Sequence, residues 1–284
     1  MADALTLPAP AKLNLFLHIT GRRSDGYHEL QTYFQILDIC DWLSFSHRRD
    51  GAITLTGMTD SGEDNLIVRA ARRLQGEIPG PAAGADIRID KRLPMGGGLG
   101  GGSSDAATTL IALNRLWELE LDQQRLATLG LELGADVPVF VHGRSAWGEG
   151  VGEQLTPIPA PEHWFVVLHP DCAISTREVF THPHLTRDTP KRRIPHAFEG
   201  KGTHLRNDCE PAVRLLYPKV AEAIDWLKNY GNARLTGTGA CVFCSFETQS
   251  AAIEAFAKRP SGIKGFIAQG KNQSPLFTQL GGLD

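Results

Sequence analysis

The sequence predicts an α+β protein of two domains, and three patterns carry this prediction. An alternating segment at residues 85–90 leads through a glycine-rich loop into a pattern with apolar residues at helical spacing. Strand and helix patterns alternate again over residues 213–268, which is typical of a second α+β unit. Three prolines within residues 157–161 mark the boundary between these two parts of the chain. We therefore expect one domain over residues 1–160 and an α+β domain over residues 161–284.

Periodicity and turn residues place the individual elements along the chain. We expect strands over residues 7–19, 31–38, 41–45, 53–56, 85–90, 164–170, 233–235, 240–246 and 263–268. We expect helices over residues 63–74, 103–117, 122–133, 175–180, 213–229 and 249–258. Residues 143–153 and 181–207 read as loops, and the part of the second loop from Arg187 to Arg206 carries six basic residues against two acidic ones. Such a basic rim is either a solvated loop or a surface that attracts a polyanionic substrate.

The composition limits the classes of protein to which the chain can belong. The 284 residues are 42% hydrophobic and 21% charged, which is typical of a soluble globular chain with a sizeable core. A formal net charge of −3 argues against a general nucleic-acid binder or a membrane-surface protein. Apolar runs fall short of the roughly 20 residues that span a membrane, and the first residues lack the pattern of a signal peptide. We expect a cytoplasmic protein with no nucleic-acid or membrane partner, which is a monomer or a weak homodimer.

The cysteines predict reduced thiols. Their number, five, is odd, and they are spread along the chain, unlike a disulfide framework. Cys241 and Cys244 have the spacing of a metal or redox pair, but the chain has no second pair, and the surrounding segment reads as a buried strand. We expect both to be core residues.

The glycine-rich loop is the strongest functional signal. Six of the seven residues from Gly96 to Gly102 are glycine, so the backbone can close around a ligand without steric conflict from Cβ atoms. Ser103, Ser104 and Asp105 suit the start of the helix that follows. Because a helix start offers free N–H groups and a positive dipole end, this arrangement predicts a phosphate site.

Other glycine-rich motifs fit this loop less well. A P-loop ends in Gly-Lys-Ser/Thr, whereas glycine precedes Ser103 and no lysine lies between Lys91 and Lys191. A dinucleotide fold is disfavoured because the preceding strand is amphipathic and no acidic ribose ligand follows in a βαβ unit. A flexible linker remains as an alternative, although linkers are rarely framed by a strand and a helix.

Three further groups of residues are candidates for the site. Lys12 and Asn14 share one face of the first strand, where both can reach a ligand, or the strand is simply half exposed. Tyr27 and His28 follow an Asp-Gly turn and offer a stacking face and ring nitrogens, which suit a nucleobase. Asp136 lies in a turn, since Pro138 disfavours helix at the residue before it. On spacing alone, each group also has an ordinary structural explanation.

Taken in order, five motifs resemble one kinase superfamily. They are PAPAKLNL at residues 8–15, DGYH at 25–28, PMGGGLGGGSSDA at 94–106, GADVP at 134–138 and GTG at 237–239. This series closely resembles the galactokinase, homoserine kinase, mevalonate kinase and phosphomevalonate kinase superfamily. Within it, the series is similar to the members that act on a cytidine-diphosphate substrate, and the match runs nearly from end to end.

The resemblance implies a two-domain α+β fold with ATP and substrate in the cleft between the domains. It implies ATP-dependent phosphorylation, with Mg²⁺, of the 2-hydroxyl of 4-diphosphocytidyl-2-C-methyl-D-erythritol in the non-mevalonate isoprenoid pathway. Residues 1–160 are then the ATP-binding domain. Asp136 is expected to be the general base and Lys12 its charged neighbour.

The resemblance also assigns the binding residues. The residues matched to ATP binding are Pro94, Met95, Gly96, Gly97, Gly98, Leu99, Gly100, Gly101, Gly102, Ser103, Ser104 and Asn65, the last on the adenine side. Asn14, Tyr27 and His28 are expected to recognise the cytidine, and Phe180 to be a second aromatic beside the cytosine. Asp105 is expected to face away from the phosphates or to act through Mg²⁺.

Two alternatives remain beside this reading. A homoserine or mevalonate type of kinase shares the glycine loop, but has no reason to carry the DGYH motif at residues 25–28. A nucleotide-binding regulator or an RNA-binding protein could keep the fold without catalysis. Loss of Lys12 or Asp136 would favour such a protein, and both residues are present.

Overall fold

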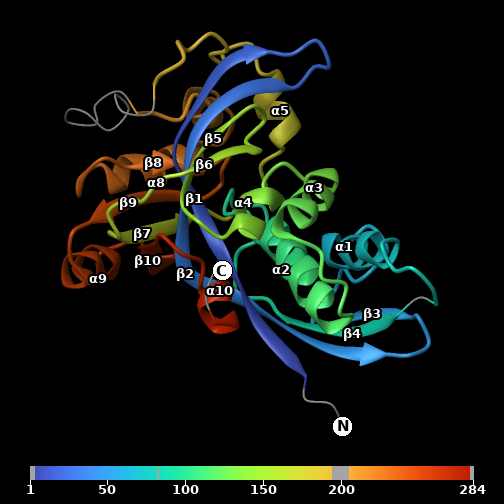
Figure 1. Ribbon diagram of the computed structural model, residues 1–284. Helices are drawn as coiled ribbons and strands as arrows, with labels where there is room; N and C mark the ends of the chain where they lie inside the picture. The colour runs from blue at the N-terminus through green and yellow to red at the C-terminus, as the bar shows by residue number, and fades with distance from the viewer. Residues whose placement is uncertain (1–3, 82, 194–204, 282–284) are drawn as a thin grey trace.

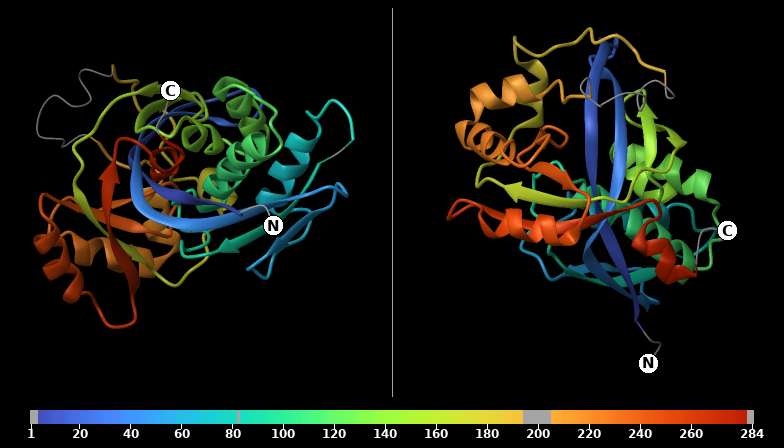
Figure 2. Two further views of the ribbon diagram at one scale, coloured as in Figure 1. Left: turned by 60° about the horizontal axis from the view of Figure 1, so that its bottom comes forward. Right: turned by 90° about the vertical axis from the view of Figure 1, so that its left-hand side faces the viewer.

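The fold is built around one long antiparallel hairpin. The computed structural model describes residues 4–81, 83–193 and 205–281. In it, β1 (Leu5–Arg22) pairs with β2 (His28–Arg48) along nearly its whole length. The hairpin runs between the two halves of the molecule, as two views show (Figures 1 and 2). Both strands are buried on both faces over most of their length, because each half packs against them.

A single sheet continues from the hairpin into both halves. Within the described residues the pairing order is β3-β4-β2-β10-β7-β9-β8, with β1 and β5 also paired to β2 and β6 paired to β5. The strands beyond the hairpin are β3 (Ile53–Thr56), β4 (Gly84–Asp90), β5 (Ala146–Glu149), β6 (Gln154–Pro157), β7 (Trp164–His169), β8 (Arg234–Leu235), β9 (Val242–Phe246) and β10 (Lys264–Lys271). Because β10 pairs with both β2 and β7, it joins the two halves through backbone hydrogen bonds.

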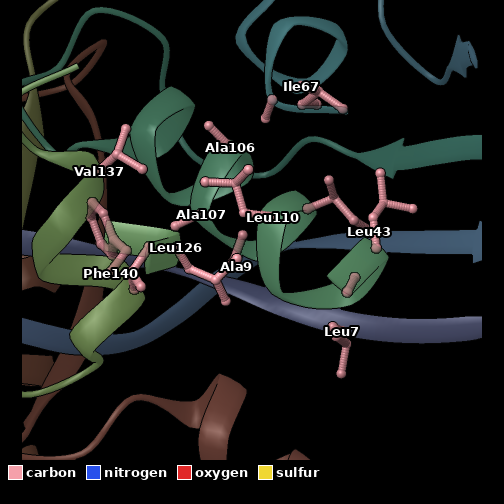
Figure 3. Close-up of a cluster of buried hydrophobic side chains, with 14 of the residues drawn as sticks. Leu7, Ala9, Leu43, Ile67, Ala106, Ala107, Leu110, Leu126, Val137 and Phe140 are labelled. Carbon is pink, nitrogen blue, oxygen red and sulfur yellow. The ribbon is translucent and has the colours of Figure 1, made fainter. Parts of the chain in front are cut away.

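The first core lies between the hairpin and a group of helices. These helices are α1 (Leu66–Gln75), α2 (Gly101–Leu116), α3 (Gln123–Leu133), α4 (Val137–His142) and α10 (Pro275–Leu280). Figure 3 shows Leu7 and Ala9 of β1 near Ala107 and Leu110 of α2, with Phe140 of α4 beside them. All five side chains are buried. This packing fixes the start of α2, and therefore the end of the glycine loop.

The second core uses the other end of β1. Its helices are α5 (Thr176–Thr181), α7 (Glu210–Leu216), α8 (Pro218–Leu227) and α9 (Gln249–Ala257). Leu17 and Ile19 of β1 pack here with Val166 of β7 and Ile224 of α8. One strand thus supplies side chains to both cores, which holds the two halves in a fixed relation.

Several elements differ from the predicted ones for local reasons. Residues 41–45 continue β2 rather than forming a separate strand. Residues 143–153, predicted as a loop, contain β5. The helix predicted over residues 213–229 is two helices that break at Pro218, since proline lacks the N–H that would continue the first. The helix α10 near the C-terminus was not predicted.

Two corrections concern the site itself. Val137 is helical although Pro138 follows it, because Pro138 occupies the first turn of α4, where an N–H has no intrahelical partner. The helix after the glycine loop, α2, begins at Gly101 with Gly100 as its N-cap, and not at residue 103 as predicted. Ser103 and Ser104 therefore lie inside its first turn. Cys241 and Cys244 are free and buried, as predicted.

The proposed boundary near residue 160 stays a prediction. The helix α10 follows that boundary in the chain, yet Leu276 and Phe277 pack into the first core. Much of the predicted basic loop, residues 194–204, lies outside the described residues. Among the described helices, none combines the length and apolarity that a membrane crossing needs.

Replacing Leu110 with alanine should lower the free energy of unfolding by about 3 kcal/mol, because it leaves a cavity at the centre of the first core. Leu110 is fully buried, whereas Leu131 on α3 is 41% exposed and serves as the control. Leu131→Ala should change stability by less than about 0.5 kcal/mol. Urea unfolding of both variants measures the difference, and equal midpoints would contradict this packing.

Candidate active site

The glycine loop, residues 94–100, is attached to both halves of the protein by backbone hydrogen bonds. Lys12 N donates to the carbonyl of Leu99 at 2.9 Å. From the turn between β8 and β9, Ala240 N donates to the carbonyl of Gly96 at 3.2 Å, and Cys241 N donates to that of Gly97 at 3.0 Å. The loop therefore lies between β1 and the turn that joins β8 to β9, and it forms the floor of the site.

Two glycines in this loop are required by close contacts. Gly98 has φ +72°, and a Cβ there would lie 2.2 Å from the carbonyl oxygen of Thr236. Gly100 has φ +71°, and a Cβ there would lie 2.8 Å from the ring of Phe140. Both positions combine a left-handed backbone with a neighbour that leaves no room for a side chain.

Lys12 lies at the centre of the site. Its side chain is 2% exposed, and its ammonium group donates to Asn14 Oδ1 at 2.6 Å and to the carbonyl of Gly98 at 3.1 Å. The third neighbour is the carboxylate of Asp136, with Oδ2 3.3 Å from Lys12 Nζ. The Asp136 side chain is 35% exposed, so the buried ammonium group of Lys12 is paired with a carboxylate that a ligand in the cleft can reach.

Two threonines hold Asn14 in place, and sequence reasoning missed both. Asn14 Nδ2 donates to the hydroxyl of Thr32 on β2 at 2.8 Å. Asn14 N donates to the hydroxyl of Thr236 at 3.0 Å, and that hydroxyl donates to the carbonyl of Gly98 at 3.1 Å. Thr236 directly precedes the GTG motif at residues 237–239, which was the one signal that pointed to this region.

Three cavities with shared lining residues form one cleft over this floor. The central cavity has a volume of about 360 Å³, and Lys12, Asn14, Ser103 and Asp136 are among its lining residues. A cavity of about 600 Å³ follows the glycine loop, and one of about 750 Å³ contains the aromatic residues. Thr176 lines all three.

The structure brings most of the predicted site residues to this cleft. The cavity along the loop is lined by Asn65, Pro94, Met95, Gly96, Gly97, Gly98, Leu99, Gly100, Gly101, Gly102 and Ser103. Ser104 differs from these, because it is fully buried behind the loop. The Asn65 amide is engaged in capping α1: its oxygen accepts from Ile67 N at 2.9 Å, and its nitrogen donates to the carbonyl of Asp60 at 2.6 Å.

Of the residues predicted to bind the base, Tyr27, His28 and Phe180 line the cavity of about 750 Å³, whereas Asn14 lines the central cavity. Tyr27 is 65% exposed, and His28 stacks on Phe180 with ring centroids 5.1 Å apart. Burial lowers the pKa of His28, and the positive charges of Arg187 and Arg22 lower it further. The imidazole is therefore neutral near neutral pH.

Lys91 is a charged residue of the site that sequence reasoning missed. Its ammonium group lies 2.5 Å from Asp41 Oδ2 and 2.7 Å from Asp105 Oδ2, and it lines the cavity along the glycine loop. Asp41 also accepts from two backbone N–H groups, whereas the second oxygen of Asp105 has no hydrogen-bond partner among the described residues. Asp105 is thus paired to Lys91, and both residues line the cavity along the glycine loop.

Comparison with known proteins agrees with this geometry. The model of the GHMP kinases N terminal domain matches residues 65–144, and that of the GHMP kinases C terminal matches residues 196–262. The 4-diphosphocytidyl-2-C-methyl-D-erythritol kinase of Marinobacter nauticus is 58% identical over 99% of both chains. The chain belongs to the 4-diphosphocytidyl-2-C-methyl-D-erythritol kinase family. The family member of Pseudomonas paraeruginosa is 55% identical, again over 99% of both chains.

Solved structures support the same assignment. A crystal structure of 4-(cytidine 5'-diphospho)-2C-methyl-D-erythritol kinase is 32% identical, has a TM-score of 0.81, and is matched over 94% of this chain and 99% of that one. The mevalonate kinase of Methanococcus jannaschii, at 16% identity, has a TM-score of 0.72 over 95% of this chain and 99% of its own, which shows the shared fold. The predicted α+β kinase fold is confirmed, and the chain is an ATP-dependent kinase.

The buried carboxylate of Asp105 should make stability depend on pH. Burial, opposed by Lys91 and reinforced by the charge of Asp41, raises the pKa of Asp105 from 3.8 to about 7. The folded state therefore holds this proton more tightly than the unfolded chain does, and stability falls as the pH rises between about 4 and 7. Asp105→Asn removes this loss, so the variant should gain about 1 kcal/mol per pH unit relative to the wild type over this range.

Urea unfolding at several pH values tests this prediction. The exposed Asp64, replaced by asparagine, serves as the control and should follow the wild type. Parallel stability curves for the wild type and Asp105→Asn would show that Asp105 is ionised in the fold at all these pH values.

Proposed function

We propose that this kinase transfers the γ-phosphoryl group of ATP to the 2-hydroxyl of 4-diphosphocytidyl-2-C-methyl-D-erythritol, giving the 2-phosphate and ADP, in the non-mevalonate isoprenoid pathway. The observation that carries the proposal is the placement of the Lys12–Asp136 pair. It lines the central cavity, which shares residues with the cavity along the glycine loop and with the aromatic cavity. Relatives that carry the name of this kinase, and that match the chain over 99% of both lengths, support the same reaction.

Asp136 and Lys12 perform the chemistry of the acceptor hydroxyl. Phosphoryl transfer depends on positioning and charge stabilisation more than on covalent help. The partly exposed carboxylate of Asp136 accepts the hydroxyl proton as the new phosphorus–oxygen bond forms. Lys12, fixed by Asn14 and Gly98, orients this carboxylate and adds positive charge beside the reacting oxygen.

The glycine loop and the start of α2 hold the triphosphate. Free N–H groups at the start of this 16-residue helix, together with its dipole, favour an anion. Gly98 and Gly100 let the backbone approach the phosphates closely. Asn65 lines the same cavity, and we assign it to the adenine side of the nucleotide.

The residues of the central cavity fit a magnesium ion. Ser103 lines this cavity with a hydroxyl beside the phosphate loop, while the carboxylate of Asp136 stays free to act as the base. Mg²⁺ prefers hard oxygen donors, so Ser103 and the substrate phosphates would hold it. When bound, it neutralises phosphate charge during the transfer.

The aromatic cavity takes the cytidine. Tyr27 and Phe180 offer faces for stacking, His28 offers a ring nitrogen, and Asn14 lies on the side of the reaction centre. A homoserine or mevalonate substrate has no aromatic group to occupy this cavity, which favours the cytidine substrate. The cytoplasmic location and the monomer or weak homodimer stay predictions.

Replacing Asp136 with asparagine should lower kcat by about 10²- to 10⁴-fold, since the hydroxyl loses its proton acceptor. The KM for ATP should stay close to that of the wild type. Steady-state kinetics with the cytidine substrate measure both. Asp122→Asn is the matched control, because Asp122 caps α3 and asparagine caps equally well. Turnover by Asp136→Asn at the rate of the control would exclude Asp136 as the base.

Replacing Gly98 with alanine should weaken ATP use by about 100-fold in kcat/KM, because the new Cβ forces the loop away from Thr236. Gly62→Ala is the control, since Gly62 has an ordinary φ and no atom within 4 Å of the new Cβ. Circular dichroism checks that both variants fold. Equal ATP kinetics in the two variants would argue that the loop position does not govern nucleotide binding.

A further inference from the structure

Arg187 lines the aromatic cavity and has no role in the assignments above. It follows α5 in the chain, and its guanidinium group makes four hydrogen bonds. Nε donates to His28 Nε2 at 3.3 Å. Nη1 donates to the carbonyl of Leu185 at 3.1 Å, and Nη2 donates to the carbonyls of Phe180 at 2.9 Å and His182 at 3.0 Å. Three of the four partners are backbone atoms, so the guanidinium is held in one orientation.

This contact determines which nitrogen of His28 carries the proton. A guanidinium group has only donors, so His28 Nε2 must accept and cannot carry a hydrogen. The imidazole is neutral, because burial and the charges of Arg187 and Arg22 disfavour its protonation. Its single proton therefore lies on Nδ1, which becomes a hydrogen-bond donor. No hydrogen bond from a described residue occupies Nδ1, so this donor is available to a ligand in the cavity.

Arg187 also acts on the second ring of the cavity. Its Nη2 holds the backbone carbonyl of Phe180, and the Phe180 ring stacks on the His28 ring at an interplanar angle of 25°. One side chain therefore fixes both the proton position of His28 and the backbone that presents Phe180. The arrangement links the basic segment after α5 to the base-binding end of the cleft.

We propose that Arg187 is a positioning residue that selects cytosine over uracil by holding His28 with its proton on Nδ1. This proposal rests on the proposed function, because it assigns the aromatic cavity to the base of the cytidine substrate. Cytosine presents an acceptor at N3, whereas uracil presents an N3–H donor at the same position. A fixed donor at His28 Nδ1 pairs with the first and opposes the second. Without Arg187, the imidazole is free to take either tautomer and can accept from uracil.

The first test measures the tautomer directly. Two-bond and three-bond ¹⁵N–¹H correlation spectra of the ¹⁵N-histidine-labelled protein, assigned with a His28→Gln variant, show which ring nitrogen of His28 carries the proton. We expect Nδ1–H in the wild type, and a mixture or Nε2–H in Arg187→Gln. Arg177→Gln is the matched control, because Arg177 lines the same cavity and is not bonded to His28. Nε2–H in the wild type would overturn the proposal whether or not Arg187→Gln folds.

The second test measures base selection without turnover. Calorimetric titration with CDP and with UDP gives the ratio of their affinities in each protein. We expect the preference for CDP to fall about tenfold in Arg187→Gln and to persist in Arg177→Gln. An equal loss for CDP and UDP would mean that Arg187 is only structural, and would overturn the proposal. Because both tests use binding and spectra, they stay decisive even if the kinase assay fails, and such a failure would count against the proposed function instead.

Discussion

The ammonium group of Lys12 is a buried positive charge, and the rest of the site depends on how that charge is satisfied. A buried charge is tolerated only when it is paired and hydrogen-bonded, because it loses its hydration on folding. Asn14, the carbonyl of Gly98 and Asp136 meet this requirement together. The glycine loop must therefore approach β1 closely enough for Gly98 to accept. The same interaction that stabilises the fold thus places the carboxylate beside the phosphate loop.

The strand β1 connects this local requirement to the whole molecule. Its first residues pack into one core and its last into the other, while Lys12 and Asn14 lie between them. The turn after β8 reaches the same point through Thr236 and holds the loop from the opposite side. The cleft is therefore lined by both halves of the protein, and its geometry depends on packing in each of them.

The sequence predicts the local features of this arrangement and misses those that depend on distant contacts. The glycine loop, its helix and the long first strand follow from periodicity and turn chemistry, and the family follows from the order of the motifs. Lys91 and Arg187 gave no signal, because the side chains that they bind in the site, Asp41 and Asp105 for Lys91 and His28 for Arg187, lie 14 to 159 residues away in the chain. The helical state of Val137 was missed because a rule for the residue before proline was applied where a helix begins. The roles assigned to the site residues stay predictions until they are tested by substitution.

Phosphorus NMR of the purified protein tests the central claim most directly, since it identifies the bond that is formed. The protein is incubated with Mg-ATP and 4-diphosphocytidyl-2-C-methyl-D-erythritol, and in parallel with homoserine and with mevalonate. The account predicts a new phosphomonoester signal, correlated to the carbon that bears the 2-hydroxyl, with the cytidine substrate alone. A phosphomonoester formed from homoserine or mevalonate, and none from the cytidine substrate, would contradict it.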